Sequence, residues 1–135
     1  MTIQDIKRYT KMIIDAAKKM GFTVQRYDAY STNSVYLKLD YGVSNSIRIS
    51  DHKGKKHLSY RFNLLTNLDK GYVSNGEHLR NYYSPADFEK LLHDIQVNRD
   101  NLISRYGEVG YKNFMNKNKF ENANKKGFWS QAKLV

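Results

Sequence analysis

The chain of 135 residues contains no cysteine, and this absence excludes several kinds of site at once. Disulfide frameworks, cysteine-ligated zinc sites, iron–sulfur clusters and thiol nucleophiles all require cysteine. The sequence also lacks any run of about 18 apolar residues, and its start does not have the charged, apolar and small-residue pattern of a signal peptide. We therefore expect a cytoplasmic protein that makes no membrane contact.

Acidic residues are scarce relative to basic ones, because 13 Asp and Glu stand against 23 Lys and Arg and leave a net charge of +10 at pH 7. Proline occurs once. Hydrophobic residues make up 40% of the chain and aromatic residues 13%, which is too much apolar surface for a disordered polybasic chain. We expect one folded, basic core domain. The positive charge favours a polyanionic partner, although an acidic protein is attracted by the same electrostatics.

The N-terminal segment has the pattern of an amphipathic helix. Thr2 and Asp5 have the spacing of a capping box, and Gly21 supplies a left-handed end. Between them, apolar residues recur every three or four positions and predict one buried stripe that includes Ile3, Ile6, Tyr9, Ile13, Ala17 and Met20. The lysines of the segment lie off this stripe: Lys7, Lys11, Lys18 and Lys19.

The middle of the chain changes to a period of two, which is typical of half-buried strands. Strand signals occur over four runs: 22–27, 35–41, 47–50 and 58–64. Polar turns at 42–46 and 51–56 separate the last three runs, and such short connections predict antiparallel neighbours. Residues 67–83 have no sustained period, so we expect a long surface loop there.

A second, long helix is expected after Ser84. Ser84 is a suitable cap, Pro85 occupies the first helical position where its missing N–H costs nothing, and Gly107 ends the helix. Beyond that point the chain is rich in Asn, Lys and aromatic residues. The sequence thus predicts a single domain over 1–106 and a basic, aromatic-rich C-terminal extension over 107–135.

Together these elements predict a two-layer α+β fold. An antiparallel sheet of three or four strands should carry the N-terminal helix and the long C-terminal helix on one face, with a basic tail beyond them. The alternation along each strand leaves the other face exposed to water.

That open face is the predicted binding surface. Strand parity sends cations toward it, the turn at 51–56 adds more, a tyrosine is interleaved, and the tail contributes further lysines. The members are Lys38, Arg48, Arg61, Lys53, Lys55, Lys56, Tyr36, Lys112, Lys117 and Lys119. Cations that neutralise phosphates and aromatic rings that stack on bases are typical of nucleic-acid binding.

Evidence for catalysis is weak in the sequence. The motifs of serine hydrolases, zinc proteases, P-loop enzymes and dinucleotide-binding enzymes are all missing. Asp51, His52 and His57 offer a carboxylate and two imidazoles, a set that suits a divalent metal or the activation of water, but a solvated turn explains them equally well. We expect no enzyme, no cofactor and no metal.

One short motif resembles known proteins. The run from Ser46 to His52 (SIRISDH), a lysine-rich reversal and the strand Arg61 to Leu64 resemble small basic proteins of phages and mobile elements in Gram-positive bacteria. Within that group the chain is similar to broad-spectrum type II anti-CRISPR proteins, which place helices on either side of a meander. This resemblance implies a non-enzymatic inhibitor in the host cytoplasm that binds a type II CRISPR effector nuclease with its guide RNA.

The resemblance also implicates Arg48 and His52 as members of the binding surface. Two alternatives remain beside it. One is an autonomous DNA- or RNA-binding accessory protein, and the other is a small metal-dependent nuclease that uses Asp51, His52 and His57.

Overall fold

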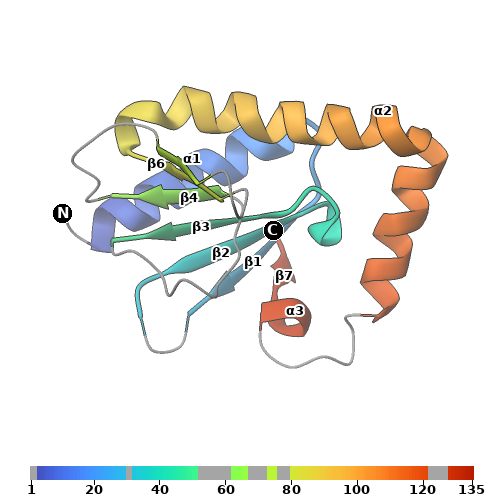
Figure 1. Ribbon diagram of the computed structural model, residues 1–135. Coiled ribbons are helices and arrows are strands. Elements are labelled where there is room, and N and C mark those ends of the chain that lie inside the picture. Colours follow the sequence, from blue (N-terminus) through green and yellow to red (C-terminus); the bar gives the residue numbers. More distant parts are fainter. Residues whose placement is uncertain (1–2, 30–31, 52–61, 67–72, 76–79, 122–127) are drawn as a thin grey trace.

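The first helix forms where its sequence pattern predicts it. The structure is a computed structural model that describes residues 3–29, 32–51, 62–66, 73–75, 80–121 and 128–135. Helix α1 spans Ile3–Lys19, and Figure 1 shows it lying across the sheet. At its end Gly21 has φ 90°, the Gly21 amide donates to the Lys18 carbonyl and the Phe22 amide donates to the Ala17 carbonyl, both at 3.0 Å. This pair of bonds is a Schellman motif, and it satisfies carbonyls that the last turn would otherwise leave open.

One mixed sheet of seven strands forms the second layer. The strands are β1 (Val24–Asp28), β2 (Val35–Leu39), β3 (Ser46–Ser50), β4 (Phe62–Leu65), β5 (Val73–Asn75), β6 (Arg80–Tyr83) and β7 (Lys133–Leu134). Their order across the sheet is β5-β6-β4-β3-β2-β1-β7. The sheet is therefore larger than the predicted three or four strands, and it is not purely antiparallel.

The first half of the predicted meander is confirmed. Strands β1 and β2 pair antiparallel, as do β2 and β3. A short 3-10 turn, η1 (Asp40–Gly42), begins the connection between β2 and β3, and Asp40 and Tyr41 in it have positive φ values of 51° and 57°. Such values are uncommon for residues other than glycine, so the surrounding contacts must hold this turn in place.

The second half of the predicted meander is wrong. Strand β4 pairs parallel to β3, and β4 also pairs parallel to β6. A tight reversal joins antiparallel neighbours, whereas parallel neighbours require a connection that returns to the other end of the sheet. The prediction of antiparallel neighbours on either side of 51–56 is therefore wrong, and residues 52–61 lie outside the described residues.

The predicted loop over 67–83 is also wrong in part. Residues 73–75 form β5 and residues 80–83 form β6, which pair antiparallel at one edge of the sheet. These strands have three and four residues, which is too short for a period of two to stand out.

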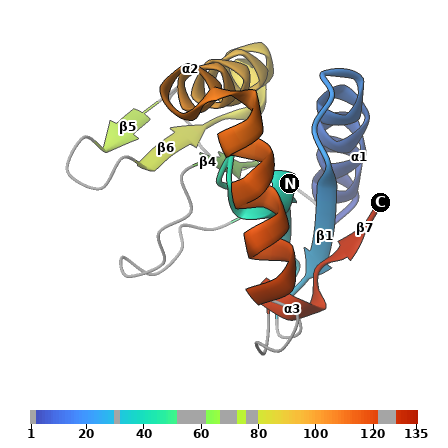
Figure 2. The same ribbon diagram turned by 90° about the vertical axis from the view of Figure 1, so that its right-hand side faces the viewer.

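The second helix begins as predicted and extends further. Ser84 and Asp87 form a capping box in which the Ser84 hydroxyl donates to Asp87 Oδ2 at 2.8 Å. A 3-10 turn, η2 (Pro85–Asp87), leads directly into α2 (Phe88–Glu121). Gly107 does not end the helix but interrupts it, with φ 75° and ψ 164°. Figure 2 shows the last part of α2 running in a different direction from the first part.

The C-terminal residues return to the sheet. The short helix α3 (Phe128–Gln131) is followed by β7, which pairs antiparallel with β1. The Val135 amide donates to the Val24 carbonyl at 3.1 Å, and Gln25 Nε2 donates to the Ala132 carbonyl at 3.3 Å. Residues beyond 107 thus contribute to the same sheet as residues near the N-terminus.

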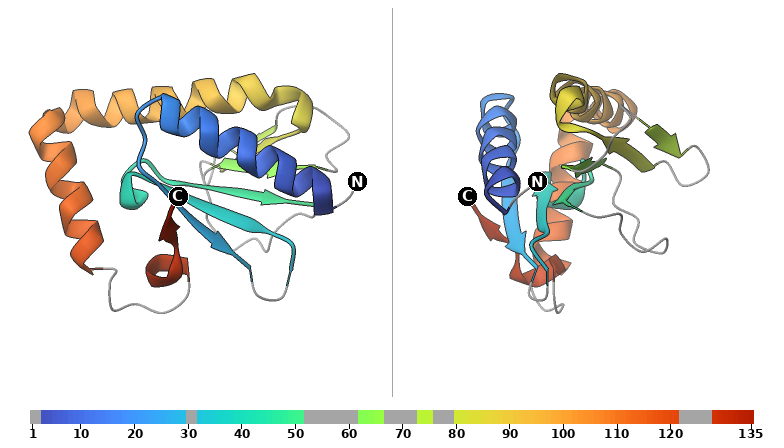
Figure 3. Two further views of the ribbon diagram at one scale, coloured as in Figure 1. Left: turned by 180° about the vertical axis from the view of Figure 1, so that it is seen from behind. Right: turned by 90° about the vertical axis from the view of Figure 1, so that its left-hand side faces the viewer.

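Both long helices pack on one face of the sheet, as predicted, and Figure 3 shows them on the same side. The apolar residues of one strand parity meet the apolar stripes of the helices in a single core. It comprises Ile6, Ile13, Ala17, Phe22, Val24, Val35, Leu37, Leu39, Ile47, Ile49, Phe62, Leu64, Tyr83, Leu91 and Ile95. The fold is α+β.

Candidate nucleic-acid interface

On the sheet face opposite the helices, the two predicted strand cations that the structure describes are buried. Strand pairing places Tyr36 beside Arg48 and Lys38 beside Ser46, on the parity that points away from the core, so the predicted facing of these side chains is correct. However, Lys38 is only 1% exposed and Arg48 only 3% exposed. The predicted exposed cationic surface on this face is therefore wrong for both residues.

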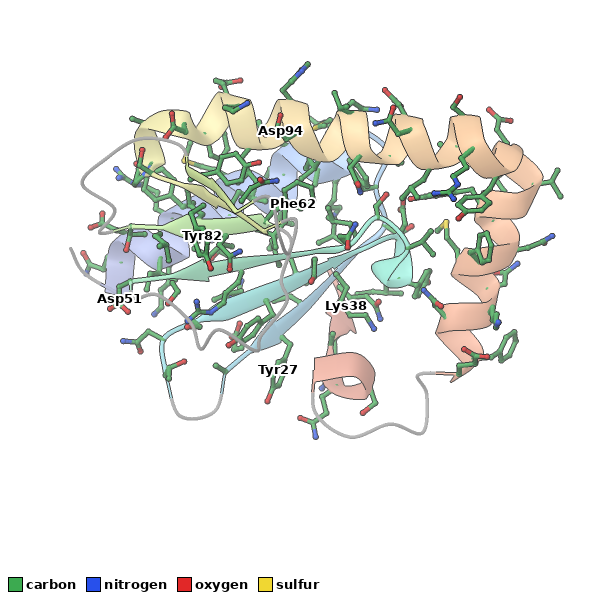
Figure 4. The ribbon with its side chains drawn as sticks, in the orientation of Figure 1. Tyr27, Lys38, Asp51, Phe62, Tyr82 and Asp94 are labelled. Atoms are coloured by element: carbon green, nitrogen blue, oxygen red, sulfur yellow. The ribbon has the colours of Figure 1, made fainter. Side chains whose placement is uncertain are left out.

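The physical reason lies in where these residues sit in the sheet. Figure 4 marks Lys38 on β2, which like β3 is an inner strand with neighbours on both sides. The Arg48 guanidinium donates to the Ser50 hydroxyl at 3.2 Å, and Ser50 contacts the Ser34 hydroxyl at 3.1 Å. Buried charges need such polar neighbours, because removal from water is costly. Strand parity predicts the face of a side chain but not what covers that face.

The other predicted residues have different fates. Tyr36 is half-buried and stacks on Tyr27, which Figure 4 labels, with ring centroids 6.1 Å apart. The remaining strand and turn candidates fall outside the described residues: His52, Lys53, Lys55, Lys56, His57 and Arg61. Asp51 is described and half-buried, whereas the two histidines predicted to bind a metal with it lie outside the described residues.

The three tail lysines are exposed on the last part of α2. Lys117 forms an ion pair of 4.0 Å with Glu121, and Lys119 lies over the Tyr41 ring at 5.8 Å. Lys112 lies on the same helix and lines a pocket. These three lysines lie together on α2, whereas the sequence analysis grouped them with the cations of the sheet face.

A different set of cations is both exposed and aligned. The outer face of α1 carries Lys7, Arg8, Lys11, Lys18 and Lys19, all exposed, and we call this set the α1 basic face. Lys7, Lys11 and Lys18 stand four and seven residues apart, so they form one row along the helix, about 16 Å long at 1.5 Å per residue. Asp15 lies on the same side of the helix and lowers the local charge.

Most of this face is free of ion pairs. Arg8 contacts Asp5 at 3.5 Å and lies over the Tyr9 ring at 4.9 Å. Within the described part of the chain, the four lysines have no carboxylate within ion-pair distance. Sequence reasoning placed these lysines off the buried stripe but gave them no role. The signal was available, because the period that predicts an apolar stripe also predicts its polar opposite.

A buried polar network joins the second part of α2 to η1 and to the segment before β1. The Tyr111 hydroxyl donates to Asp40 Oδ2 at 2.5 Å, and the Thr23 amide donates to Asp40 Oδ1 at 2.8 Å. Since Tyr111 gives its proton to Asp40, the Ser44 hydroxyl donates to Tyr111 in their 2.5 Å contact. Burial, reinforced by the bond to Asp40, raises the pKa of the Tyr111 hydroxyl well above its ordinary value. Tyr111 thus acts as a fixed donor.

The described residues contain neither a candidate metal cluster nor a candidate membrane-spanning helix. In the portion of the chain that is described, His, Asp and Glu side chains form no group of three or more that suits a metal ion. None of the helices described here combines the length and apolarity that crossing a membrane requires. Comparisons with protein-family models, curated proteins and solved structures find no match to this chain.

Proposed function

We propose that this protein is a non-enzymatic nucleic-acid-binding protein that contacts the phosphate backbone through the α1 basic face. The observation that carries the proposal is the row of Lys7, Lys11 and Lys18, which is exposed and has no ion pairs among the described residues. Duplex DNA carries one negative charge per about 1.7 Å of its axis, so a row of this length spans several phosphates.

A helix is a suitable element for this contact. The opposite side of α1 contributes Ile6, Ile13 and Ala17 to the core, so the helix is fixed relative to the sheet. Its lysines therefore present a preorganised surface, and only their side chains must become ordered on binding. Because phosphate contacts carry no sequence information directly, we expect binding with little sequence preference.

The test compares two variants that each lose three positive charges. In the first, Lys7, Lys11 and Lys18 are changed to Gln; in the matched control, Lys90, Lys117 and Lys119 on α2 are changed to Gln. Fluorescence anisotropy with a labelled duplex at 50 and 200 mM salt should show binding by the wild type that weakens steeply with salt. The α1 variant should bind much more weakly and lose roughly 3 from the slope of log K against log salt.

The matched control separates a defined surface from overall charge. We expect the control variant to bind nearly as well as the wild type, because it keeps the α1 basic face and loses only long-range attraction from the net charge. Equal weakening of both variants would refute the assignment to α1, and absence of salt-dependent binding by the wild type would refute nucleic-acid binding altogether. All six substituted lysines are exposed, so the free energy of unfolding should change by no more than about 0.5 kcal/mol per substitution.

We propose as a narrower role the inhibition of a type II RNA-guided endonuclease, supported by the resemblance over Ser46 to His52. Of that motif, Ser46–Ser50 is β3 and buried, so the similarity there concerns a core strand of the fold. Inhibition would then use the α1 basic face to compete for the channel that holds guide or target phosphates. A cleavage assay with a reconstituted endonuclease–guide complex tests it: added protein should reduce cleavage, and the α1 variant should reduce it less.

A further inference from the structure

A pocket of about 460 Å³ lies beside the bend of α2 and is not used by the proposed backbone contact. Its walls come from the segment that follows α1, from η1 and from both parts of α2. They include Gly21, Asp40, Arg99, Tyr111 and Lys112. This volume lies within the range of roughly 300 to 1,000 Å³ that small-molecule sites occupy in proteins.

The buried carboxylate of Asp40 in this pocket already has hydrogen-bond partners within the protein. Both oxygens of Asp40 accept strong hydrogen bonds, one from the Thr23 amide and one from Tyr111. Arg99 Nη1 approaches Asp40 Oδ2 only to 3.9 Å, which is too long for a hydrogen bond. Asp40 therefore forms an ion pair with Arg99 but leaves the N–H donors of its guanidinium without a hydrogen bond to this carboxylate.

Arg99 is held in place with donor capacity left over. Its side chain is 19% exposed, and its guanidinium lies 4.4 Å from the centroid of the Phe22 ring. Arg99 Nε is buried and has no hydrogen-bond partner among the described residues. A guanidinium offers a planar fork of N–H donors that matches carboxylate or phosphate oxygens. A preorganised arginine with unfilled donors thus suits an anionic group.

The remaining lining defines the rest of the ligand. Lys112 adds a second cation, while Ile103 and Met115 supply apolar surface and Asn116 an amide. Glu108 also lines the pocket and is exposed, and its carboxylate opposes an anion. The arrangement suits a molecule with one strongly anionic head and a flat, partly apolar body.

We propose that this pocket binds a nucleoside monophosphate group, with the phosphate between Arg99 and Lys112 and the base against Ile103 and Met115. A free mononucleotide and the phosphorylated end of a strand both offer this chemistry. The second source rests on the proposed function. Gly21 follows the end of α1 and lines the pocket, so a strand that runs along the α1 basic face leads toward it.

The primary experiment measures binding of AMP and of inorganic phosphate to the full chain by titration with NMR detection. The wild type should bind AMP saturably and more tightly than inorganic phosphate. Arg99→Gln should weaken AMP binding by more than about tenfold, because a charged hydrogen-bonding partner is lost. Lys112→Gln should weaken it by about threefold, and Glu108→Gln should strengthen it by about twofold, as expected for exposed charges.

Lys117→Gln is the matched control, because Lys117 lies on the same part of α2 but does not line the pocket. It should leave AMP binding unchanged. If Arg99→Gln does not fold, the opposite effects of Lys112→Gln and Glu108→Gln still decide the matter. The proposal is overturned if neither probe binds saturably, or if Lys117→Gln alters binding as much as Lys112→Gln does.

A comparison of two otherwise identical strands distinguishes the sources. Tighter binding of the 5′-phosphorylated strand than of the 5′-hydroxyl strand, lost in Lys112→Gln, supports the strand end as ligand. Binding of AMP without a difference between the strands supports the free nucleotide. The variant with Lys7, Lys11 and Lys18 changed to Gln separates this proposal from the proposed function, since it should weaken strand binding and leave AMP binding unchanged.

Discussion

At the scale of single residues, the sheet face opposite the helices carries two buried cations, Lys38 and Arg48. Arg48 is 3% exposed and donates to Ser50, whose hydroxyl in turn contacts Ser34. A side chain of this kind stabilises the fold only while its polar contacts are kept, because an unpaired buried polar group costs about 1 to 3 kcal/mol. Substitutions on this face should therefore act on stability before they act on binding.

Arg48→Glu tests the burial of this face directly. The change places a carboxylate next to strand positions that hold no exposed side chain, so it should lower the free energy of unfolding by more than about 3 kcal/mol. Lys117→Glu, the same charge reversal at an exposed helical position, should stay within about 0.5 kcal/mol of the wild type. Urea unfolding followed by circular dichroism measures both, and equal stability of the two variants would contradict the burial of Arg48.

Tyr111→Phe tests the polar network at η1. The change removes the donor to Asp40 and should destabilise the fold by about 1 to 3 kcal/mol at neutral pH. Because folding raises the pKa of Tyr111, the neutral hydroxyl stabilises the native state below the ordinary tyrosine pKa of about 10, and this contribution is lost as pH rises above it. The stability gap between wild type and variant should narrow above that pH. A gap that stays constant from pH 7 to 11 would contradict the role of Tyr111.

At the scale of elements, local signals predicted the helices well and the sheet only in part. The left-handed end at Gly21 and the cap at Ser84 depend on residues close in sequence, and both formed as predicted. The capping box predicted for Thr2 and Asp5 involves Thr2, which lies outside the described residues. The parallel pairing of β3 with β4 joins segments more than ten residues apart in sequence. A polar, glycine-containing connection looks like a hairpin turn whichever strand lies next to it. Neighbour choice is a tertiary property, and periodicity does not encode it.

Gly107 was correctly predicted to break the helical geometry, but it bends α2 instead of ending it. The chain resumes as a helix beyond Gly107, where the sequence predicted the helix to end, and Tyr111 in that second part has buried partners at η1. Gly107→Ala should destabilise the protein by about 1 to 3 kcal/mol, since its φ and ψ lie in a region that only glycine occupies readily. Gly110→Ala, inside the helix, should instead stabilise by up to about 1 kcal/mol. Thermal unfolding of the two variants should therefore shift in opposite directions, and shifts of the same sign would contradict this interpretation of the bend.

At the scale of the whole molecule, the candidate site shows what sequence reasoning misses. The excess of lysines was plain, and the lysines of α1 were assigned to the polar side of their helix. The predicted exposure of Lys38 and Arg48 was wrong because exposure depends on how layers and connections assemble. The assembled fold decides which cations are exposed to solvent. The structure shows that Lys38 and Arg48 are buried and that the lysines of the α1 basic face are exposed, so the candidate surface changes.

Removal of the C-terminal residues tests how the sheet is completed. Deletion of residues 128–135 removes β7 and leaves one edge of β1 unpaired, while β1 still pairs with β2 on its other edge. Exposed strand edges pair with other chains, so the shortened protein should unfold at lower temperature and form oligomers in light scattering. Lys133→Gln, which keeps the backbone of β7, serves as the control and should remain like the wild type. A shortened protein that keeps both the thermal stability and the molecular mass of the wild type would contradict the role of β7.

The pairing of β1 with β7 also determines when the sheet is completed during synthesis of the chain. Gln25 bonds to Ala132, so the two partners are 107 positions apart along the polypeptide. At about 5 to 20 residues per second, a ribosome needs roughly 5 to 20 seconds to make that stretch. Throughout this interval one edge of the β1–β2 hairpin lacks its partner, and it is paired only after residues 133–134 have emerged from the ribosome.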